Sequence, residues 1–259
     1  MGGAATRAYP FTGQYGMRRF YSPTPLNANT ILNLPSGIQH HWVTVLRASV
    51  GEQAVLFDGC GGEHLAELTQ IDKKSAQVRL LDFNPDNRSP AYAVTLGLVM
   101  SKGDRMDYAI QKATELGVAQ IQLLTSERCE MRLKYDRDQK KIEHWQSVAI
   151  AACEQCGLNL VPSILAPLGL EAWCADNTDS LKLVLALQQQ QSPLPQQALP
   201  AWISLLIGAE GGLTEDEIRS SEQHGFQRWQ LGSRILRTET APVVALASLP
   251  YHASLYPST

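Results

Sequence analysis

The sequence lacks the features that mark membrane proteins, disulfide-rich secreted proteins and strongly basic proteins that coat nucleic acid. No apolar run approaches the ~20 residues of a membrane-spanning helix, and residues 1–16 lack the apolar core of a secretory signal. Five cysteines are too few, and odd in number, for a disulfide-stapled domain. The formal net charge of −3 provides no strong positive field for RNA. We therefore expect a cytoplasmic protein without a membrane partner.

Cysteine and histidine are also too scattered for a metal site. Cys153 and Cys156 have the spacing of half a zinc site, but no second cysteine pair or suitably spaced histidine accompanies them. Both cysteines fall on or near the apolar face of a predicted helix, which favours packing. His40 and His41 are expected to pack or to form hydrogen bonds. We predict no metal.

The chain divides into two regions of different pattern, as its length of 259 residues suggests when a domain usually has about 100 to 200. Residues 1–16 are small, polar and glycine-rich, and are expected to be a disordered tail. Residues 17–88 are predicted to form a small β-barrel domain. Its β-rich pieces, broken by turn residues, are residues 53–57, 64–69 and 76–81. The polar stretch 84–90 is predicted to link it to a second domain, residues 91–255.

Alternating strand and helix patterns predict an α/β fold for the second domain. Apolar residues recur at helical spacing in residues 103–116 and 136–157, and a glycine stands where each helix should end. The β-rich or aliphatic runs are residues 92–99, 121–124, 181–187 and 203–207. Continuous aliphatic runs are typical of strands covered on both faces in a parallel sheet. The glutamine-rich stretch 188–197 is expected to be an exposed loop.

One segment has the character of a ligand-binding loop. Residues 207–218 (IGAEGGLTEDEI) leave a buried strand through a glycine turn and enter a helix, whose start is marked by the capping-box pair Thr214 and Glu217. Glycines in such a turn let backbone N–H groups approach a ligand closely. The segment lacks the Lys-Ser/Thr of a P-loop and the glycine spacing of a dinucleotide site. By itself it indicates either a ligand loop or an ordinary tight turn.

A second segment, residues 231–241 (LGSRILRTETA), gathers polar groups before an apolar helix predicted at residues 243–249. Together the two segments resemble the GPEGG and LG-x-RILRTETA motifs of the ribosomal RNA small subunit methyltransferase E family. This family consists of uridine-N3 methyltransferases of the SPOUT (trefoil-knot) superfamily. Ala209 replaces the proline of the first motif.

Further stretches share this resemblance, which covers roughly residues 17–254. Residues 102–118 are similar to the family's K-x-x-R…QKATELGV helix, and residues 154–157 to its EQ-x-G segment. Leu158 stands where the family has arginine. The stretches that resemble its opening strand and its H-x-x-x-VLR element are residues 17–21 and 41–47.

The resemblance implies an α/β fold with a trefoil-knotted, parallel-sheet domain that binds S-adenosylmethionine and a PUA-like β-barrel that contacts RNA. The implied cofactor residues lie on three loops: Leu185, Leu187, Gly208, Glu210, Gly211, Gly212, Leu231, Gly232, Ile235, Leu236, Arg237, Thr240 and Ala241. Uridine N3 must lose a proton before it attacks, so Arg237 is implied to stabilise the anion, with Glu210 and Glu239 as bases or orienting groups. An equal alternative for Glu239 is a structural carboxylate paired with Arg237.

The same resemblance implies which groups contact RNA: Arg18, Arg19, Arg47, Lys102 and Arg105. A solvated helix end is the alternative for the last two, and a basic enrichment over residues 128–141 indicates either a solvated helix face or a phosphate-binding patch.

The expected partners are small-subunit (16S) ribosomal RNA or the assembled small subunit, and a second copy in a homodimer. The predicted helices carry more aliphatic surface than one sheet needs for its cover. Two alternatives to uridine-N3 methylation of 16S ribosomal RNA remain open. One is another SPOUT methyltransferase that acts on a ribose hydroxyl or on transfer RNA, and the other is a cofactor-free RNA-binding assembly protein.

Overall fold

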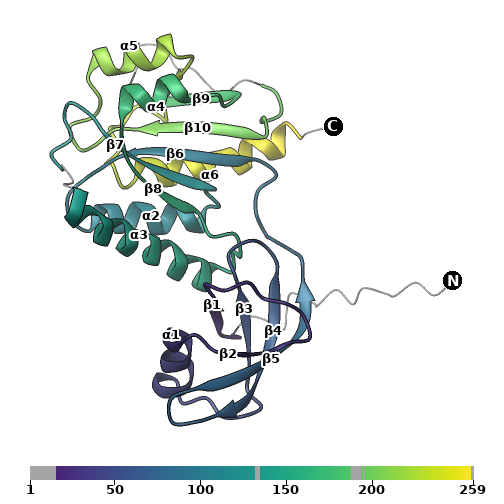
Figure 1. The fold of residues 1–259 in the computed structure, drawn as a ribbon. Helices are drawn as coiled ribbons and strands as arrows, with labels where there is room; N and C mark the ends of the chain where they lie inside the picture. The colour runs from purple at the N-terminus through teal and green to yellow at the C-terminus, as the bar shows by residue number, and fades with distance from the viewer. Residues whose placement is uncertain (1–15, 132–134, 188–193, 195, 258–259) are drawn as a thin grey trace. The chain divides into compact units, whose positions relative to one another are not determined.

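The computed structural model describes residues 16–131, 135–187, 194 and 196–257, with the side chains of residues 135–138 left out. The predicted tail apart from Gly16, and most of the glutamine-rich stretch, therefore lie outside the described residues. The chain forms two compact units, Met1–Asn87 and Arg88–Thr259 (Figure 1).

The first unit is built on a mixed five-stranded sheet in the order β1-β3-β4-β5-β2. Its strands are β1 (Arg19–Tyr21), β2 (Ile31–Asn33), β3 (Gln53–Phe57), β4 (Glu63–Ile71) and β5 (Ala76–Asn84). Buried and more exposed residues alternate along β4 and β5, as expected of strands with one face on a core. A short helix, α1 (Ser36–Gln39), continues as the π-helical turn η2 (His40–Val45) and places Trp42 in that core, fully buried.

The second unit is built on a six-stranded sheet in the order β11-β9-β10-β6-β7-β8, in which every pair of neighbours is parallel. The strands are β6 (Ala93–Val99), β7 (Gln120–Thr125), β8 (Ser163–Gly169), β9 (Leu181–Leu185), β10 (Trp202–Ile207) and β11 (Gln227–Trp229). The central strands β6 and β10 are almost wholly buried, as their continuous aliphatic sequence predicted.

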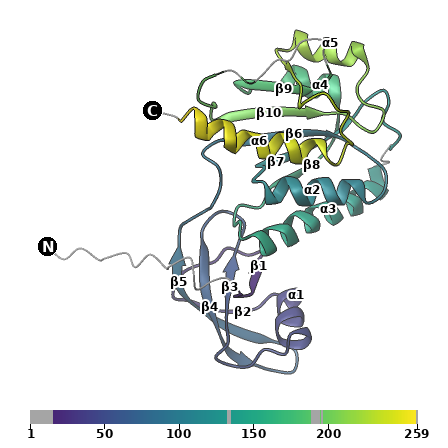
Figure 2. The ribbon, with the colours of Figure 1, turned by 180° about the vertical axis from the view of Figure 1, so that it is seen from behind.

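Helices cover both faces of this sheet. Helices α2 (Arg105–Glu115), α3 (Tyr135–Cys156) and α6 (Ala241–Leu255) lie on one side, and α4 (Leu170–Asp176) and α5 (Glu215–Gln223) on the other (Figure 2). Gly117 and Gly157 follow the ends of α2 and α3 with φ of +80° and +90°, the left-handed conformation that glycine adopts without strain. The predicted glycine stops are thus confirmed. None of the helices in the described ranges is long and apolar enough to cross a membrane.

Several elements differ from the sequence-based expectation. Helix α6 is longer than residues 243–249, and β9 ends at Leu185, so Leu187 lies on the loop beyond it. The strands β8 and β11 and the helix α4 were not predicted. Helix α4 has a packing role, since Trp173 rests on β6 where Gly97 has no side chain. A Cβ at Gly97 would lie 2.5 Å from the indole ring.

Candidate cofactor site

Three loops of the second unit meet where neighbouring parallel strands end. Strands β9, β10 and β11 all run the same way, so the loops that follow them lie at one edge of the sheet. Together they enclose a pocket of about 490 Å³, which we call the loop pocket. This volume is within the ~300–1,000 Å³ typical of small-molecule sites.

The turn after β10 is shaped by glycine. A Cβ on Gly208 would lie 3.0 Å from the backbone of Gly212 and Leu213, so the chain folds back on itself too closely for a side chain. Gly212 has φ +66°, and its N–H donates to the carbonyl oxygen of Ala209 at 2.8 Å. The turn ends at Thr214, which caps α5 in a capping box with Glu217, as predicted. It thus presents backbone to the loop pocket.

The walls of the loop pocket are mainly apolar. They are formed by Leu185, Leu187, Ile207, Leu213, Ile218, Trp229, Leu231, Ile235 and Leu236. Ile235 is 85% exposed although it is a large aliphatic residue. An apolar slot with backbone polar groups at its edge suits a flat heteroaromatic ring that has hydrogen-bonding atoms on its rim.

Only three of the described residues that line the loop pocket are charged: Arg128, Glu210 and Arg234. Glu210 forms an ion pair with Arg105, whose side chain comes from the first turn of α2. Burial raises the pKa of Glu210, but hydrogen bonds from its own backbone N–H and from Arg105 outweigh burial and hold that pKa below its usual value. Glu210 is therefore a carboxylate at neutral pH.

Most of the residues predicted to bind the cofactor line this pocket: Leu185, Leu187, Gly208, Glu210, Gly211, Gly212, Leu231, Gly232, Ile235, Leu236 and Ala241. Arg237 and Thr240 do not. Their backbones instead join to start α6, because the Arg237 carbonyl oxygen accepts the N–H groups of Thr240 and Ala241, each at 2.9 Å.

The two remaining catalytic candidates differ in their surroundings. The guanidinium of Arg237 is 79% exposed and lies 3.9 Å from Glu239, whose side chain is 17% exposed. The other carboxylate oxygen of Glu239 is buried and has no hydrogen-bond partner among the described residues. Glu239 was alternatively expected to be a structural carboxylate paired with Arg237. That pair is present, although 3.9 Å is long for an ion pair.

The three arginines of the first unit that were predicted to contact RNA differ in their exposure to solvent. Arg18 and Arg47 are exposed. Arg19 is largely buried: it forms an ion pair with Glu63 at 2.5 Å and lies over the ring of Phe57, with 5.1 Å between the guanidinium carbon and the ring centroid. Two of the three arginines therefore face solvent, and the third is engaged within its own unit.

The RNA candidates of the second unit are both in exposed ion pairs. Lys102 contacts Glu130 at 2.7 Å, and this hydrogen bond raises the pKa of Lys102. Arg105 contacts Glu210 at the loop pocket. Exposed pairs of this kind contribute little stability, so these cations can exchange partners readily.

Sequence reasoning missed the two pocket arginines, Arg128 and Arg234. Arg234 lies inside the recognised motif of residues 231–241, yet its side chain received no role. Arg128 was seen only as part of the basic enrichment over residues 128–141, much of whose side-chain structure lies outside the described residues. Its contact is with Gly211, far along the chain, and no local pattern reports such a contact.

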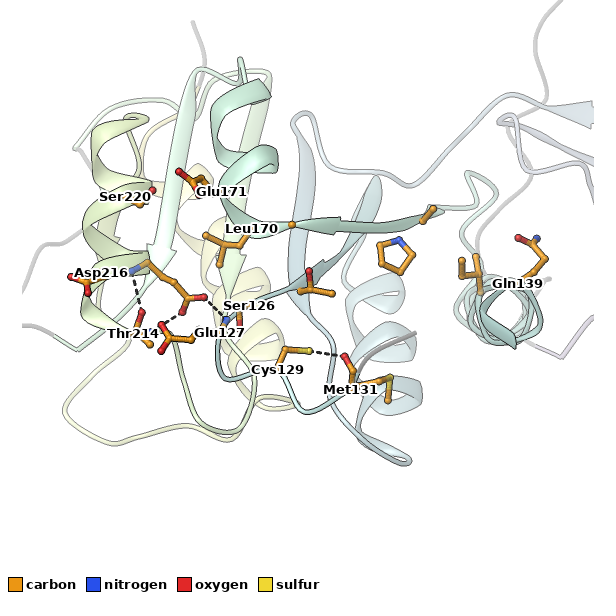
Figure 3. A pocket seen from close by; sticks show the side chains of 16 residues that line it. Ser126, Glu127, Cys129, Met131, Gln139, Leu170, Glu171, Thr214, Asp216 and Ser220 are labelled. Atoms are coloured by element: carbon orange, nitrogen blue, oxygen red, sulfur yellow. Dashed lines mark hydrogen bonds between the residues drawn. The ribbon is translucent and has the colours of Figure 1, made fainter. Parts of the chain in front are cut away.

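A second, larger hollow of about 1,090 Å³ lies beside the loop after β7 and the start of α5 (Figure 3). We call it the acidic hollow, because four carboxylates line it: Glu127, Glu171, Asp216 and Glu217. Within the described part of its lining there is no lysine or arginine. Glu217 accepts the backbone N–H of Glu127 at 2.7 Å, so these carboxylates partly serve the local fold.

No group of three or more His, Cys, Asp or Glu residues in the described ranges is arranged to hold a metal ion. Cys153 is buried on α3 with its sulfur 3.7 Å from the Leu160 carbonyl oxygen. The loop pocket is the candidate site because it combines a glycine turn with apolar walls at the ends of parallel strands.

The chain is similar to known RNA methyltransferases over nearly its whole length. A family model for an RNA methyltransferase domain matches residues 87–250, and one for an RNA methyltransferase PUA domain matches residues 34–81. Ribosomal RNA small subunit methyltransferase E of Buchnera aphidicola is 32% identical over 89% of this chain and 92% of its own. The Bacillus subtilis protein of the same name is 34% identical over 83% of this chain and 88% of its own.

Solved structures give the same result. Ribosomal RNA small subunit methyltransferase E from Neisseria gonorrhoeae, bound to S-adenosylmethionine, superposes with a TM-score of 0.85 at 37% identity, over 93% of this chain and 98% of that one. A methyltransferase from Legionella pneumophila in complex with the same cofactor has a TM-score of 0.85 at 36% identity, over 91% and 97%. The predicted fold class, an α/β methyltransferase domain with a parallel sheet and a PUA-like domain, is confirmed, and the trefoil knot stays a prediction.

Proposed function

The chain belongs to the ribosomal RNA small subunit methyltransferase E family, and we propose from this that it methylates N3 of a uridine in 16S ribosomal RNA with S-adenosylmethionine. The observation that carries the proposal is the loop pocket, in which a glycine turn and apolar walls meet at the ends of three parallel strands. Methyl transfer needs such a site, because the donor is already activated and the protein mainly orients it.

The residues present fit the cofactor. The apolar walls suit the adenine ring, and the turn at Gly208, where a Cβ would collide with backbone, leaves room for a ligand to approach the main chain. The carboxylate of Glu210 suits the positive charges of the ligand. When bound, S-adenosylmethionine supplies a methyl group on a sulfonium, which is the electrophile.

We assign the polar steps to three side chains. Glu210, ionised and in the loop pocket, accepts the N3 proton of uridine or orients the group that does so. The exposed guanidinium of Arg237 is available to a substrate, and it stabilises the negative charge that develops on the uracil ring. Glu239 orients Arg237 from beside it. Loss of charge at Arg237 should therefore affect turnover rather than cofactor binding.

RNA positioning is assigned to the exposed arginines of the first unit, Arg18 and Arg47, and to Lys102 and Arg105 in the second. Phosphate contacts of this kind fix the position of the RNA without reading its sequence. Arg19 supports the first unit through Glu63. We propose that residues 17–88 hold the RNA and that residues 91–255 perform the chemistry, as a cytoplasmic homodimer.

Two measurements test the proposal. Titration calorimetry should show one S-adenosylmethionine site per chain. The absence of binding at millimolar cofactor would contradict the proposal that the protein is an enzyme. Mass mapping of nucleosides, after reaction with 16S RNA and with assembled small subunits, should show N3-methyluridine. A ribose 2′-O-methyl product or a methylated transfer RNA would favour the other SPOUT activities, and binding of RNA without methylation would favour an assembly protein.

The role of Arg237 is tested separately. Arg237→Ala should lower kcat by about 100-fold or more, because removing a preorganised stabiliser of developing charge costs that much in other enzymes. Cofactor affinity should stay unchanged, because the side chain is not part of the pocket lining. Arg219→Ala, at an exposed position in the middle of α5, is the matched control and should keep full turnover. A near-normal kcat in Arg237→Ala would show that Arg237 has only a structural role, at the start of α6.

A further inference from the structure

The loop pocket receives a side chain from outside its three loops. Arg128 lies on the loop that follows β7, yet it lines the pocket together with residues more than fifty positions away in the chain. Its Nη1 donates to the carbonyl oxygen of Gly211 at 2.8 Å. Its alkyl chain covers the glycine turn, since a Cβ on Gly211 would lie 3.3 Å from Cβ and Cδ of Arg128. The guanidinium is therefore held in place at the pocket.

Arg128 retains hydrogen-bonding capacity in that position. A guanidinium has five N–H donors, and within the described residues only the Gly211 carbonyl oxygen accepts from Arg128. The fork of a guanidinium matches a carboxylate, which it can bind with two parallel hydrogen bonds. The pocket thus presents a prepared site for an anion beside the glycine turn.

The charges around the turn match a zwitterion. Arg128 contacts Gly211, and the neighbouring residue Glu210 is a carboxylate at the same pocket. The amino-acid part of S-adenosylmethionine carries one carboxylate and one ammonium on the same carbon. On the basis of the proposed function, we propose that Arg128 binds the carboxylate of the cofactor's methionine part and thereby orients its sulfonium.

The other arginines are less suited to this role. Arg234 lines the pocket and is exposed, as Arg128 is, but none of the described residues accepts a hydrogen bond from the Arg234 side chain. It would have to be ordered when the ligand binds, which has an entropic cost. Arg237 lies outside the lining. Of the two described arginines that line the pocket, Arg128 is the one whose side chain is fixed by a contact to the turn.

The test compares two ligands that differ only in the carboxylate. Wild-type protein and Arg128→Gln are titrated with S-adenosylmethionine and with decarboxylated S-adenosylmethionine. The wild type should prefer the intact cofactor by about 10- to 100-fold, the usual effect of a hydrogen-bonded charge pair. In Arg128→Gln this preference should fall to near unity, with the affinity for the decarboxylated ligand unchanged. That unchanged affinity also shows that the variant is folded.

Controls separate the proposal from the function on which it rests. Arg234→Gln should keep the preference for the intact cofactor, and Arg128→Lys should retain part of it because the charge remains without the fork. If the wild type binds neither ligand, the proposed function fails. If the wild type binds both and Arg128→Gln keeps the full preference, the proposed role of Arg128 fails. A loss of RNA affinity alone in Arg128→Gln would assign the residue to the substrate and would overturn the proposal.

Discussion

At the scale of single residues, Gly208 shapes the loop pocket by having no side chain. A Cβ there would lie 3.0 Å from two backbone atoms, at Gly212 and Leu213, which cannot move without distorting the turn. Gly208→Ala should therefore weaken S-adenosylmethionine binding by about 10-fold or more, as measured by calorimetry. Gly169→Ala is the control, since a Cβ there meets nothing within 4 Å and the residue has an ordinary φ of −66°. Equal affinities in both variants would show that the turn does not contact the cofactor.

The ion pair of Arg105 and Glu210 predicts a pH dependence. The pKa of Glu210 is lowered, so its charged form is retained until the pH falls below the usual range for a carboxyl group. Arg105→Gln removes a cause of that lowering, and the pKa of Glu210 should rise. The acid limb of the methylation rate against pH should therefore move to higher pH. Lys112→Gln, which removes the cation of a pair with Glu115 on the same helix, should leave the limb in place. An unmoved limb in Arg105→Gln would mean that ionised Glu210 is not required.

At the scale of elements, the start of α5 connects the glycine turn to the rest of the fold. The Thr214 hydroxyl oxygen accepts a hydrogen bond from the backbone N–H of Glu217 at 3.2 Å. In return, the Glu217 carboxylate accepts one from the backbone N–H of Thr214 at 2.8 Å. Thr214→Ala should lower the free energy of unfolding by about 1 kcal/mol, measured by urea denaturation. Ser147→Ala, at an exposed mid-helix site of α3, should not destabilise because alanine favours helices. Equal stability of both variants would show that the cap contributes nothing.

The sequence predicted those elements that leave a strong local pattern. The glycine stops after α2 and α3 and the capping box of α5 depend on a few adjacent residues, and all were confirmed. Helix α4 and strand β11 were missed because they are too short for a repeating pattern to show. Strand β8 (SILAPLG) contains Pro167, and its apolar and polar residues do not alternate, so it also gave no clear strand signal.

The candidate site divides in the same way. Residues on the three loops could be anticipated, because two of the loops carry compact motifs and glycine turns at strand ends are recognisable. Arg128 could not, since its place at Gly211 depends on the pairing of strands far apart in the chain. The exposure of the Arg237 side chain could not be predicted from the sequence either, because the direction of a side chain on a loop depends on the fold around it.

At the scale of the whole molecule, the second unit leaves large apolar residues exposed on two neighbouring helices. Helix α6 is apolar on every side, which is typical of a helix surrounded by protein. Tyr251 and Leu255 on α6 are nevertheless 69% and 55% exposed, and Tyr108 on the adjoining helix α2 is 46% exposed. Exposed apolar groups on neighbouring helices are characteristic of protein interfaces.

We therefore expect a two-fold homodimer formed through α2 and α6, since a two-fold pairing lets one apolar surface cover its own copy. An obligate interface of this kind should bury more than roughly 2,000 Å². Light scattering at micromolar concentration should give about twice the chain mass of 28.5 kDa. Tyr251→Asp should shift the protein toward monomer, because it would bury a charge at the interface. Val50→Asp, at a 59% exposed apolar residue of the first unit, should leave the mass unchanged. A wild-type monomer that methylates RNA at full rate would exclude this dimer, and the exposed face of α6 would then need another partner.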